Sequence, residues 1–177
     1  KGARCGLITT RGFRDVLELG RRTRPNNYGM TGSFEPLIDR ELRLEVSERL
    51  DARGRVVLPL DETEVRSALE RLESLGAEAV VIHFLHAYAN PIHEERATEI
   101  AREIWKSGFI STSSEILREV REFERGSTAA VNAYVQPILA AYLERISQRL
   151  KDAGFLHQLL VMQGNGGTLT AQAAARQ

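Results

Sequence analysis

Apolar residues recur along the chain with spacings that separate strands from helices. Between Leu42 and Leu50 they occupy even positions and alternate with charged residues, which predicts a strand with one buried and one wet face. The turn at 51–54 then predicts a hairpin whose second strand covers 55–58. The near-continuous apolar run 79–85 predicts instead a central strand that is buried on both faces.

Helical spacing predicts three main helices. Asp61, with Glu64 three residues later, forms a capping-box-like start for a helix that ends at Gly76. Asn90 as N-cap and Pro91 as first helical residue predict a second helix. A third and longer helix is predicted over 127–151, with Ser127 as its cap. Its apolar positions are Val131, Val135, Ile138, Leu139, Tyr142, Ile146 and Leu150.

Shorter apolar segments complete the pattern. Strands are predicted at 3–9, 109–113 and 159–162, and a further helix is predicted around Phe13 to Leu17. Strands that alternate with helices indicate an α/β architecture with a largely parallel or mixed sheet and flanking helices.

Composition excludes several classes of partner. Lys plus Arg and Asp plus Glu both number 24, so the formal net charge is zero and no overall field favours nucleic acid or an acidic membrane surface. The longest apolar stretch, 77–89, is shorter than the roughly 20 residues of a spanning helix. No basic and apolar leader opens the chain, and the single cysteine, Cys5, fits a reducing cytosol. We therefore expect a cytoplasmic protein in which Cys5 is a small buried hydrophobe.

Two glycine-containing turns are candidate binding segments. The turn at 164–167, Gly-Asn-Gly-Gly, follows a strand, so its amides could approach a phosphate or a carbonyl closely; the alternative is an ordinary turn. The segment 10–15 lies at a strand-to-helix junction, where helix N–H groups attract anions and Arg11 adds a full charge. Asp15 there could orient Arg11, cap the helix or take part in the site.

Two other polar groups are interpreted as structural. His86, Asn90 and His93 lack the further ligands that a zinc site needs, so we predict no metal site and expect His86 to be a core histidine with a backbone hydrogen bond. The charged run 115–125 is typical of a solvated face. Arg125, at its end, could alternatively hold two halves of a cleft together.

Four strings occur in an order that resembles the hydantoinase A/oxoprolinase family of large ATP-dependent amidohydrolases. They are TTRGFRDVLE at 9–18, LHAYANPIHE at 85–94, ERGST with VNAYVQPI at 124–128 and 131–138, and MQGNGG at 162–167. The resemblance covers nearly the whole chain. Because such enzymes are several times longer, and because both ends of this chain look cut, the resemblance implies an internal segment.

The resemblance implies a fold and a reaction. The fold would be a fragment of an actin-like (ribonuclease H-like) ATPase, with residues 1–125 ending an N-terminal domain and 126–177 starting the catalytic domain. The enzyme would use ATP with Mg²⁺ to phosphorylate a cyclic amide such as a hydantoin or oxoproline, and would work with a hydantoinase B-type subunit or domain; a homo-oligomer is left open. The alternatives are the acetone-type carboxylase branch and a non-catalytic folded fragment.

The resemblance also points to candidate residues around a nucleotide or substrate cleft, without assigning a catalytic base. The phosphate loop of the Asp-Gly-Gly-Thr type that the family carries does not occur in these residues, and the second glycine-rich segment expected beyond 167 is not reached. We therefore predict that the isolated segment binds no nucleotide tightly and is inactive. The candidates are Thr10, Arg11, Gly12, Asp15, Arg125, Asn165, Gly166 and Gly167.

Overall fold

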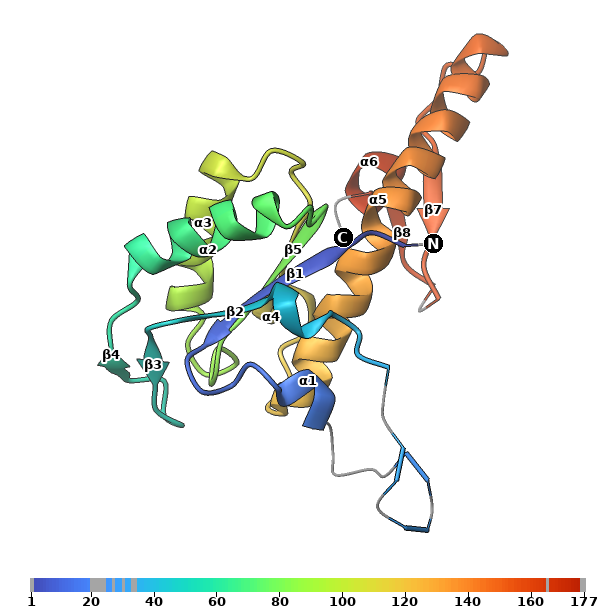
Figure 1. Cartoon of the computed structure of the whole chain (residues 1–177). Helices are drawn as coiled ribbons and strands as arrows, with labels where there is room; N and C mark the ends of the chain where they lie inside the picture. Colours follow the sequence, from blue (N-terminus) through green and yellow to red (C-terminus); the bar gives the residue numbers. More distant parts are fainter. Residues whose placement is uncertain are drawn as a thin grey trace.

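A parallel four-stranded sheet forms the centre of the protein (Figure 1). The computed structural model describes residues 2–19, 25–26, 28–29, 31–32, 35–164 and 166–175. The strand order is β2-β1-β5-β6, and every neighbouring pair is parallel. The strands are β1 (Cys5–Thr10), β2 (Arg43–Val46), β5 (Ala79–His83) and β6 (Ile110–Thr112).

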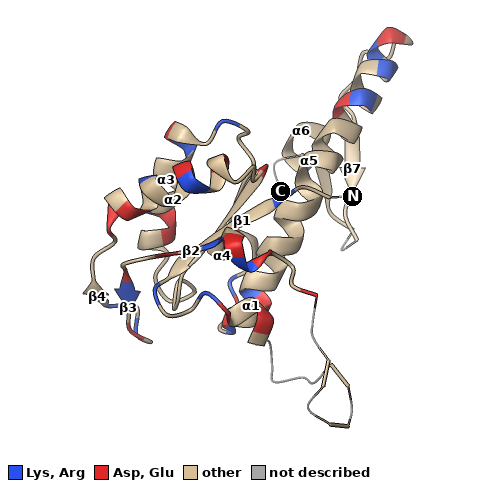
Figure 2. Cartoon of the chain, viewed as in Figure 1, with Lys and Arg blue, Asp and Glu red and all other residues tan. Residues whose placement is uncertain are grey.

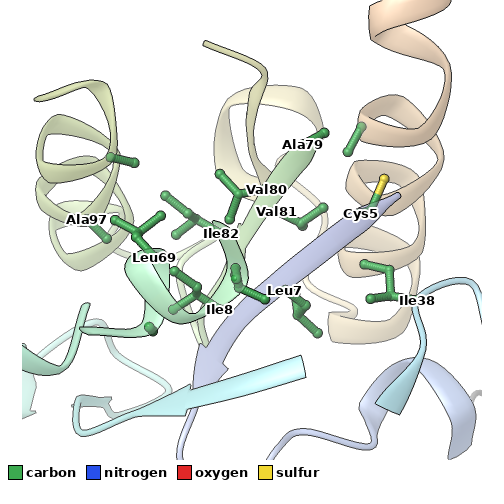
Figure 3. Packing of buried hydrophobic residues seen from close by; sticks show 14 of the residues in the cluster. Cys5, Leu7, Ile8, Ile38, Leu69, Ala79, Val80, Val81, Ile82 and Ala97 are labelled. Carbon is green, nitrogen blue, oxygen red and sulfur yellow. The ribbon is translucent and has the colours of Figure 1, made fainter. Parts of the chain in front are cut away.

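Helices cover both faces of this sheet. α2 (Glu62–Ser74) and α3 (Ile92–Ile104) pack together on one face, and α5 (Glu122–Asp152) crosses the other (Figure 1). Every residue of β1 and β5 is buried, as expected for central strands with two covered faces. Side chains alternate accordingly: Ile8 points toward α2 and α3, and Leu7 points toward α5 (Figure 3).

The prediction of an α/β fold is confirmed, and the choice of a mixed sheet is corrected. The main sheet is parallel throughout, and the connections from β2 to β5 and from β5 to β6 return through the helices α2 and α3. The antiparallel pairs are separate two-stranded hairpins. They join β3 (Arg49–Leu50) to β4 (Val56–Leu58), and β7 (Leu160–Met162) to β8 (Thr168–Thr170).

The single strand predicted over 42–50 is wrong, because the chain breaks at Ser47 and Glu48. The first part pairs with β1 as β2, and the second forms the predicted hairpin as β3. Glu48 is only 2% exposed. Its carboxylate binds partners inside the protein, which the alternating pattern did not anticipate. The short elements η1 (Arg40–Leu42) and α1 (Val16–Leu19) lie before β2.

The predicted helix starts hold to within a residue for α2 and α3. Asp61 caps α2 by accepting hydrogen bonds from the backbone N–H groups of Thr63 and Glu64, and Gly76 follows its end with φ +76°. α3 begins at Ile92 rather than Pro91, and the Asn90 side chain accepts a hydrogen bond from the Ile92 N–H.

The buried face of α5 differs from the predicted one. The helix begins at Glu122, so Ser127 does not cap it; its hydroxyl donates to the Glu124 carbonyl within the helix. The large apolar positions Val131, Ile138 and Tyr142 are each at least 50% exposed. The face that meets the sheet consists mainly of small residues and includes one arginine. Its members are Arg125, Gly126, Ala129, Ala130, Ala133, Gln136 and Leu143.

The C-terminal part of the chain lies beside the outer part of α5. The β7–β8 hairpin leads into α6 (Ala171–Ala174), which contacts α5, and the hairpin lies away from the carboxyl end of β1 (Figure 1). The predicted domain join at Arg125 falls inside α5 and stays a prediction. None of the described helices combines the length and apolar character that a membrane crossing requires. Acidic and basic residues are interleaved along α2, α3 and the end of α5 (Figure 2).

Candidate functional site

The strand order defines one topological switch point. From β1 the chain passes to β2 on one side, and the later strand β5 lies on the other side of β1. In open α/β sheets, ligands bind outside the carboxyl ends of the strands at such a point. The segments that follow β1 and β5 therefore form the expected site. We call this the switch-point site and define it by Thr10, Arg11, Glu48, His83 to His86, His93, Glu94, Ser113, Glu122 and Arg125.

One buried carboxylate joins the ends of three neighbouring segments. Glu48 accepts a short hydrogen bond from the Thr10 hydroxyl, and its second oxygen lies 2.7 Å from His93 Nδ1. The Thr10 oxygen in turn accepts a hydrogen bond from the Leu85 N–H at 2.9 Å. Thr10, one of the predicted candidates, is thus fixed at 1% exposure and positions the chain that follows β5.

A second buried carboxylate, Glu94, holds the segment after β5 to the segment after β6. It accepts hydrogen bonds from the Phe84 N–H at 2.7 Å, the Ser113 hydroxyl at 2.6 Å and the Ser114 N–H at 2.8 Å. Burial raises the pKa of Glu94, and these hydrogen bonds oppose that rise. Ser113 begins the short helix α4 (Ser113–Ile116).

Arg125 is the central cation of the site and is fully buried. Its guanidinium donates to the Phe84 carbonyl at 2.6 Å, to the Ser113 hydroxyl at 3.0 Å and, in a short ion pair, to Glu122. A solvated face, the general expectation for the charged run, is wrong for Arg125, which is fully buried, whereas the Glu122 side chain is 19% exposed. They lie on the turn of α5 that faces the sheet, where an unpaired charge would be costly.

His83 ends β5 within the same network. Its Nδ1 lies 3.0 Å from the Ser113 hydroxyl, and its Nε2 lies 3.8 Å from a Glu122 oxygen. Burial, with the positive charge of Arg125 as the lesser cause, lowers the pKa of His83 from 6.5 to about 3. The imidazole is therefore neutral at physiological pH.

His86 does not match the satisfied core histidine that was expected. It is partly exposed, its backbone has φ +60°, and its buried Nδ1 has no hydrogen-bond partner in the described part of the chain. Its backbone N–H donates to Glu122 at 3.0 Å, and its ring contacts the Tyr88 ring edge to face, with centroids 5.9 Å apart.

The segment from Arg11 to Asp15 forms ion pairs at the rim of the site. Arg11 donates to Glu64 at 2.7 Å, and the Gly12 N–H, at φ +88°, donates to the Glu45 carboxylate at 2.7 Å. Asp15 pairs with Arg40 and Arg43 rather than with Arg11. The Arg40 hydrogen bond is the main cause that lowers the pKa of Asp15.

The glycine turn at 164–167 lies apart from the switch-point site in Figure 1. Asn165 falls outside the described residues. The Gly166 N–H donates to the Gln163 carbonyl, and the Gln163 N–H donates to the Gly167 carbonyl at 2.7 Å, so the turn closes the β7–β8 hairpin. The structure thus brings Thr10, Arg11 and Arg125 into one region and leaves this turn elsewhere.

Two surface cavities also lie away from the predicted candidates. One, of about 770 Å³, is lined by Ala3, Trp105 and Phe109 at the amino ends of the strands and by Pro137 of α5. The other, of about 600 Å³, lies between α5 and the segment that includes Leu159 and Ala171. Neither cavity is lined by buried ionisable groups, whereas the switch-point site gathers several.

Sequence reasoning missed Glu48 and Glu94, although the sequence carries a signal for each. Glu48 occupies an even position in the alternation from Leu42 to Leu50, so it falls where a core residue was expected. Glu94 precedes Ala97 and Ala101 by three and seven residues, which places it on the inward stripe of α3. A charged residue at a position that faces the core therefore indicates a buried polar site, whereas a charged residue at any other position does not.

The fold and the site define a doubly wound α/β domain with a buried ionic network at its switch point. Two family models, described as the hydantoinase/oxoprolinase N-terminal region and as hydantoinase/oxoprolinase, match residues 1–105 and 125–177. The chain belongs to the hydantoinase/oxoprolinase family of ATP-dependent enzymes.

Individual relatives cover nearly all of the chain. An uncharacterized protein of Methanocaldococcus jannaschii is 44% identical over 93% of this chain and 24% of its own length. The acetophenone carboxylase gamma subunit of Aromatoleum aromaticum is 35% identical over 95% of the chain and 25% of its own. The crystal structure of the ATP-dependent caprolactamase from Pseudomonas jessenii matches with a TM-score of 0.85 and 30% identity, over 95% of this chain and 25% of that one.

The chain spans about a quarter of the length of these relatives and 15% of the length of the 5-oxoprolinase of Saccharomyces cerevisiae. The family also includes 5-oxoprolinase and an acetone carboxylase subunit. Several homologues are named subunits of enzymes: the alpha subunit of a caprolactamase, the beta subunit of an acetone carboxylase and the gamma subunit of an acetophenone carboxylase.

Proposed function

We propose that this chain is part of an ATP-dependent hydrolase that opens a cyclic amide of the hydantoin, oxoproline or lactam type. The observation that carries the proposal is the close match with the caprolactamase structure, at a TM-score of 0.85 over 95% of the chain. Membership of the family supports it, because members named oxoprolinase and caprolactamase occur among the relatives.

The proposed reaction overcomes the poor electrophilicity of an unstrained amide. The γ-phosphoryl group of ATP moves to the carbonyl oxygen of the ring, and ADP leaves. Water then adds to the ring carbon, and the carbon–nitrogen bond breaks with a proton going to nitrogen, which leaves an acyl phosphate. A second water attacks this acyl phosphate and gives the free carboxylate and inorganic phosphate. The phosphoryl group thus converts the amide oxygen into a leaving group, which is its catalytic value.

The residues of this chain would shape part of the cleft rather than hold the nucleotide by themselves. The buried carboxylates Glu48 and Glu94 are already engaged by internal hydrogen bonds, and no group of three metal-ligating side chains occurs within the described ranges. We therefore assign no step through Mg²⁺·ATP to a residue of this chain. Thr10 and Arg125 instead fix the segment after β5, at the edge of the sheet where a ligand is expected.

Three further features belong to the same proposal. The parent protein would have an actin-like fold with its domain join near Arg125, it would bind Mg²⁺ with ATP, and it would work with a hydantoinase B-type subunit. The existence of multi-subunit relatives supports the last of these. The isolated chain would then lack most of the nucleotide site and be inactive.

A second candidate is the carboxylase branch, in which the phosphoryl group activates a ketone or bicarbonate. The observation that favours it is the 35% identity with the acetophenone carboxylase gamma subunit. The two candidates share the phosphoryl transfer and differ in the acceptor.

The test is ATP hydrolysis by the whole protein with its B-type partner, measured with hydantoin, 5-oxoproline, caprolactam, or acetone plus bicarbonate. Stimulation by a cyclic amide supports the hydrolase, and stimulation only by the ketone with bicarbonate supports the carboxylase. An absence of stimulation contradicts both. The 177-residue chain is assayed alongside, and turnover by it alone would contradict its predicted inactivity.

A further inference from the structure

The backbone of His86 is held in a conformation that its side chain disfavours. At φ +60° it is the one non-glycine residue with a positive φ among residues 2–19, 35–164 and the other described positions. The left-handed region is disfavoured for an L-residue, because its Cβ then lies too close to the following carbonyl oxygen. Such conformations persist where the surroundings impose them, and they cluster at ligand-binding and active sites.

The surroundings of His86 impose this conformation through the buried ionic network. The His86 N–H donates to Glu122 at 3.0 Å, and Glu122 is held by the fully buried Arg125. The His86 carbonyl accepts hydrogen bonds from the N–H groups of Ala89 at 3.0 Å and Asn90 at 3.3 Å. Both backbone groups of His86 are therefore bonded, and the network fixes where the imidazole lies.

The imidazole of His86 has no hydrogen-bond partner within the described ranges of the chain. Nδ1 is shielded from solvent and has no partner among the described residues, so Nε2 is the nitrogen open to a ligand. A buried N–H without an acceptor is rarer than an under-satisfied acceptor. This favours the tautomer that carries its proton on Nε2 and leaves the buried Nδ1 as an acceptor. The ring edge-to-face contact with Tyr88, at 72°, limits its rotation.

We propose that His86 is a substrate-binding residue whose Nε2–H donates a hydrogen bond to an acceptor oxygen of the substrate. It lies three residues after β5, and the intervening Leu85 is bound to Thr10 at the end of β1. His86 is thus placed at the switch point between β1 and β5, where a ligand is expected. This inference rests on the proposed function, and the ligand class is a carbonyl compound with an exposed oxygen, either a cyclic amide or a ketone.

The experiment compares His86→Asn and His86→Gly in the whole protein with its partner subunit. Asn tolerates the left-handed region and Gly adopts it freely, so both variants keep the backbone and remove the imidazole. We expect the melting temperature to stay equal or rise. We also expect kcat/KM for the stimulating carbonyl compound to fall about tenfold or more, as for one lost hydrogen bond in the transition state, with KM for ATP unchanged.

A purely structural role would give the same relief of backbone strain but leave the activity unchanged. Wild-type kinetics in both variants would therefore overturn the proposal, and so would a lowered melting temperature in His86→Gly. His157→Asn, which replaces an exposed histidine elsewhere on the chain, is the matched control and should leave the kinetics unchanged. If no carbonyl compound stimulates ATP hydrolysis by the wild type, the proposed function fails and this inference fails with it. A loss of kcat/KM that is confined to the His86 variants supports both.

Discussion

His93 Nδ1 lies 2.7 Å from a carboxylate oxygen of Glu48, and both side chains are at least nine-tenths buried. Glu48 follows β2, and His93 lies in the first turn of α3, which follows β5. These two strands flank β1, whose last residue, Thr10, donates to the other Glu48 oxygen. A single carboxylate therefore ties together the ends of three adjacent strands.

Replacement of Glu48 by alanine should destabilise the protein by about 3 kcal/mol. The change leaves the Thr10 hydroxyl and the His93 imidazole without their partner in the interior, and an unsatisfied buried polar group costs about 1 to 3 kcal/mol. Urea unfolding at pH 7 measures the loss. Glu70→Ala, on the exposed face of α2, is the control and should change stability by less than about 0.5 kcal/mol. Equal losses would contradict the role of Glu48.

His83 should make the protein sensitive to acid. Its folded pKa, about 3, lies below the unfolded value of 6.5, so between these values the unfolded state binds more protons. The stability that His83 contributes is therefore fully present above pH 6.5 and is lost as the pH falls from 6.5 toward 3. The free energy of unfolding, measured in urea at pH 7, 6, 5 and 4, should decline across this window by a few kcal/mol.

The variant His83→Asn isolates this contribution from that of the carboxylates. It should be less stable than the wild type at pH 7, because the contact with Ser113 changes, and the difference should shrink as the pH falls. A constant difference between pH 7 and pH 4 would show that His83 does not remain neutral in the folded state.

Arg125 should be far less replaceable than an exposed cation of the same charged run. Arg125→Met keeps a similar length but removes the cation from Glu122 and a donor from the Phe84 carbonyl, and the loss of one partner of a buried pair costs about 3 to 5 kcal/mol. Urea unfolding of Arg125→Met and of Arg118→Met, which lies on the exposed part of the charged run, measures the difference. A loss of less than about 1 kcal/mol in Arg125→Met would contradict the network described around it.

Local patterns predicted most of the elements because local forces decide them. Asp61 and Gly76 bound α2 as expected, and the apolar run at 79–83 forms a strand buried on both faces. These features depend on capping, on glycine's left-handed conformation and on burial, all of which a single sequence displays.

The face of α5 could not be predicted in the same way, because the closeness of its approach to the sheet decides which residues are buried. A Cβ on Gly126 would lie 3.0 Å from the His83 ring, so small residues are needed on the side facing β5. The larger apolar residues Val131 and Ile138 are consequently exposed. The same approach buries Arg125 and brings Glu122 against it, which creates a part of the site that the charged sequence run did not reveal.

Gly54 should be more sensitive to substitution than another glycine with the same backbone angle. Gly54 and Gly76 have φ +75° and +76°, so alanine is strained by about 1 to 2 kcal/mol at either position. A Cβ on Gly54 would also lie 3.0 Å from Asn90 Cβ and 3.3 Å from the Ala89 backbone, whereas a Cβ on Gly76 would meet nothing within 4 Å. The Gly54 carbonyl moreover accepts a hydrogen bond from the Asn90 side chain at 2.8 Å.

We therefore expect Gly54→Ala to lose at least about 1 kcal/mol more stability than Gly76→Ala in urea unfolding. The reason is that the clash moves backbone that is packed against the loop carrying His86. Equal losses in the two variants would mean that only the backbone angle matters and that the hairpin does not support this loop.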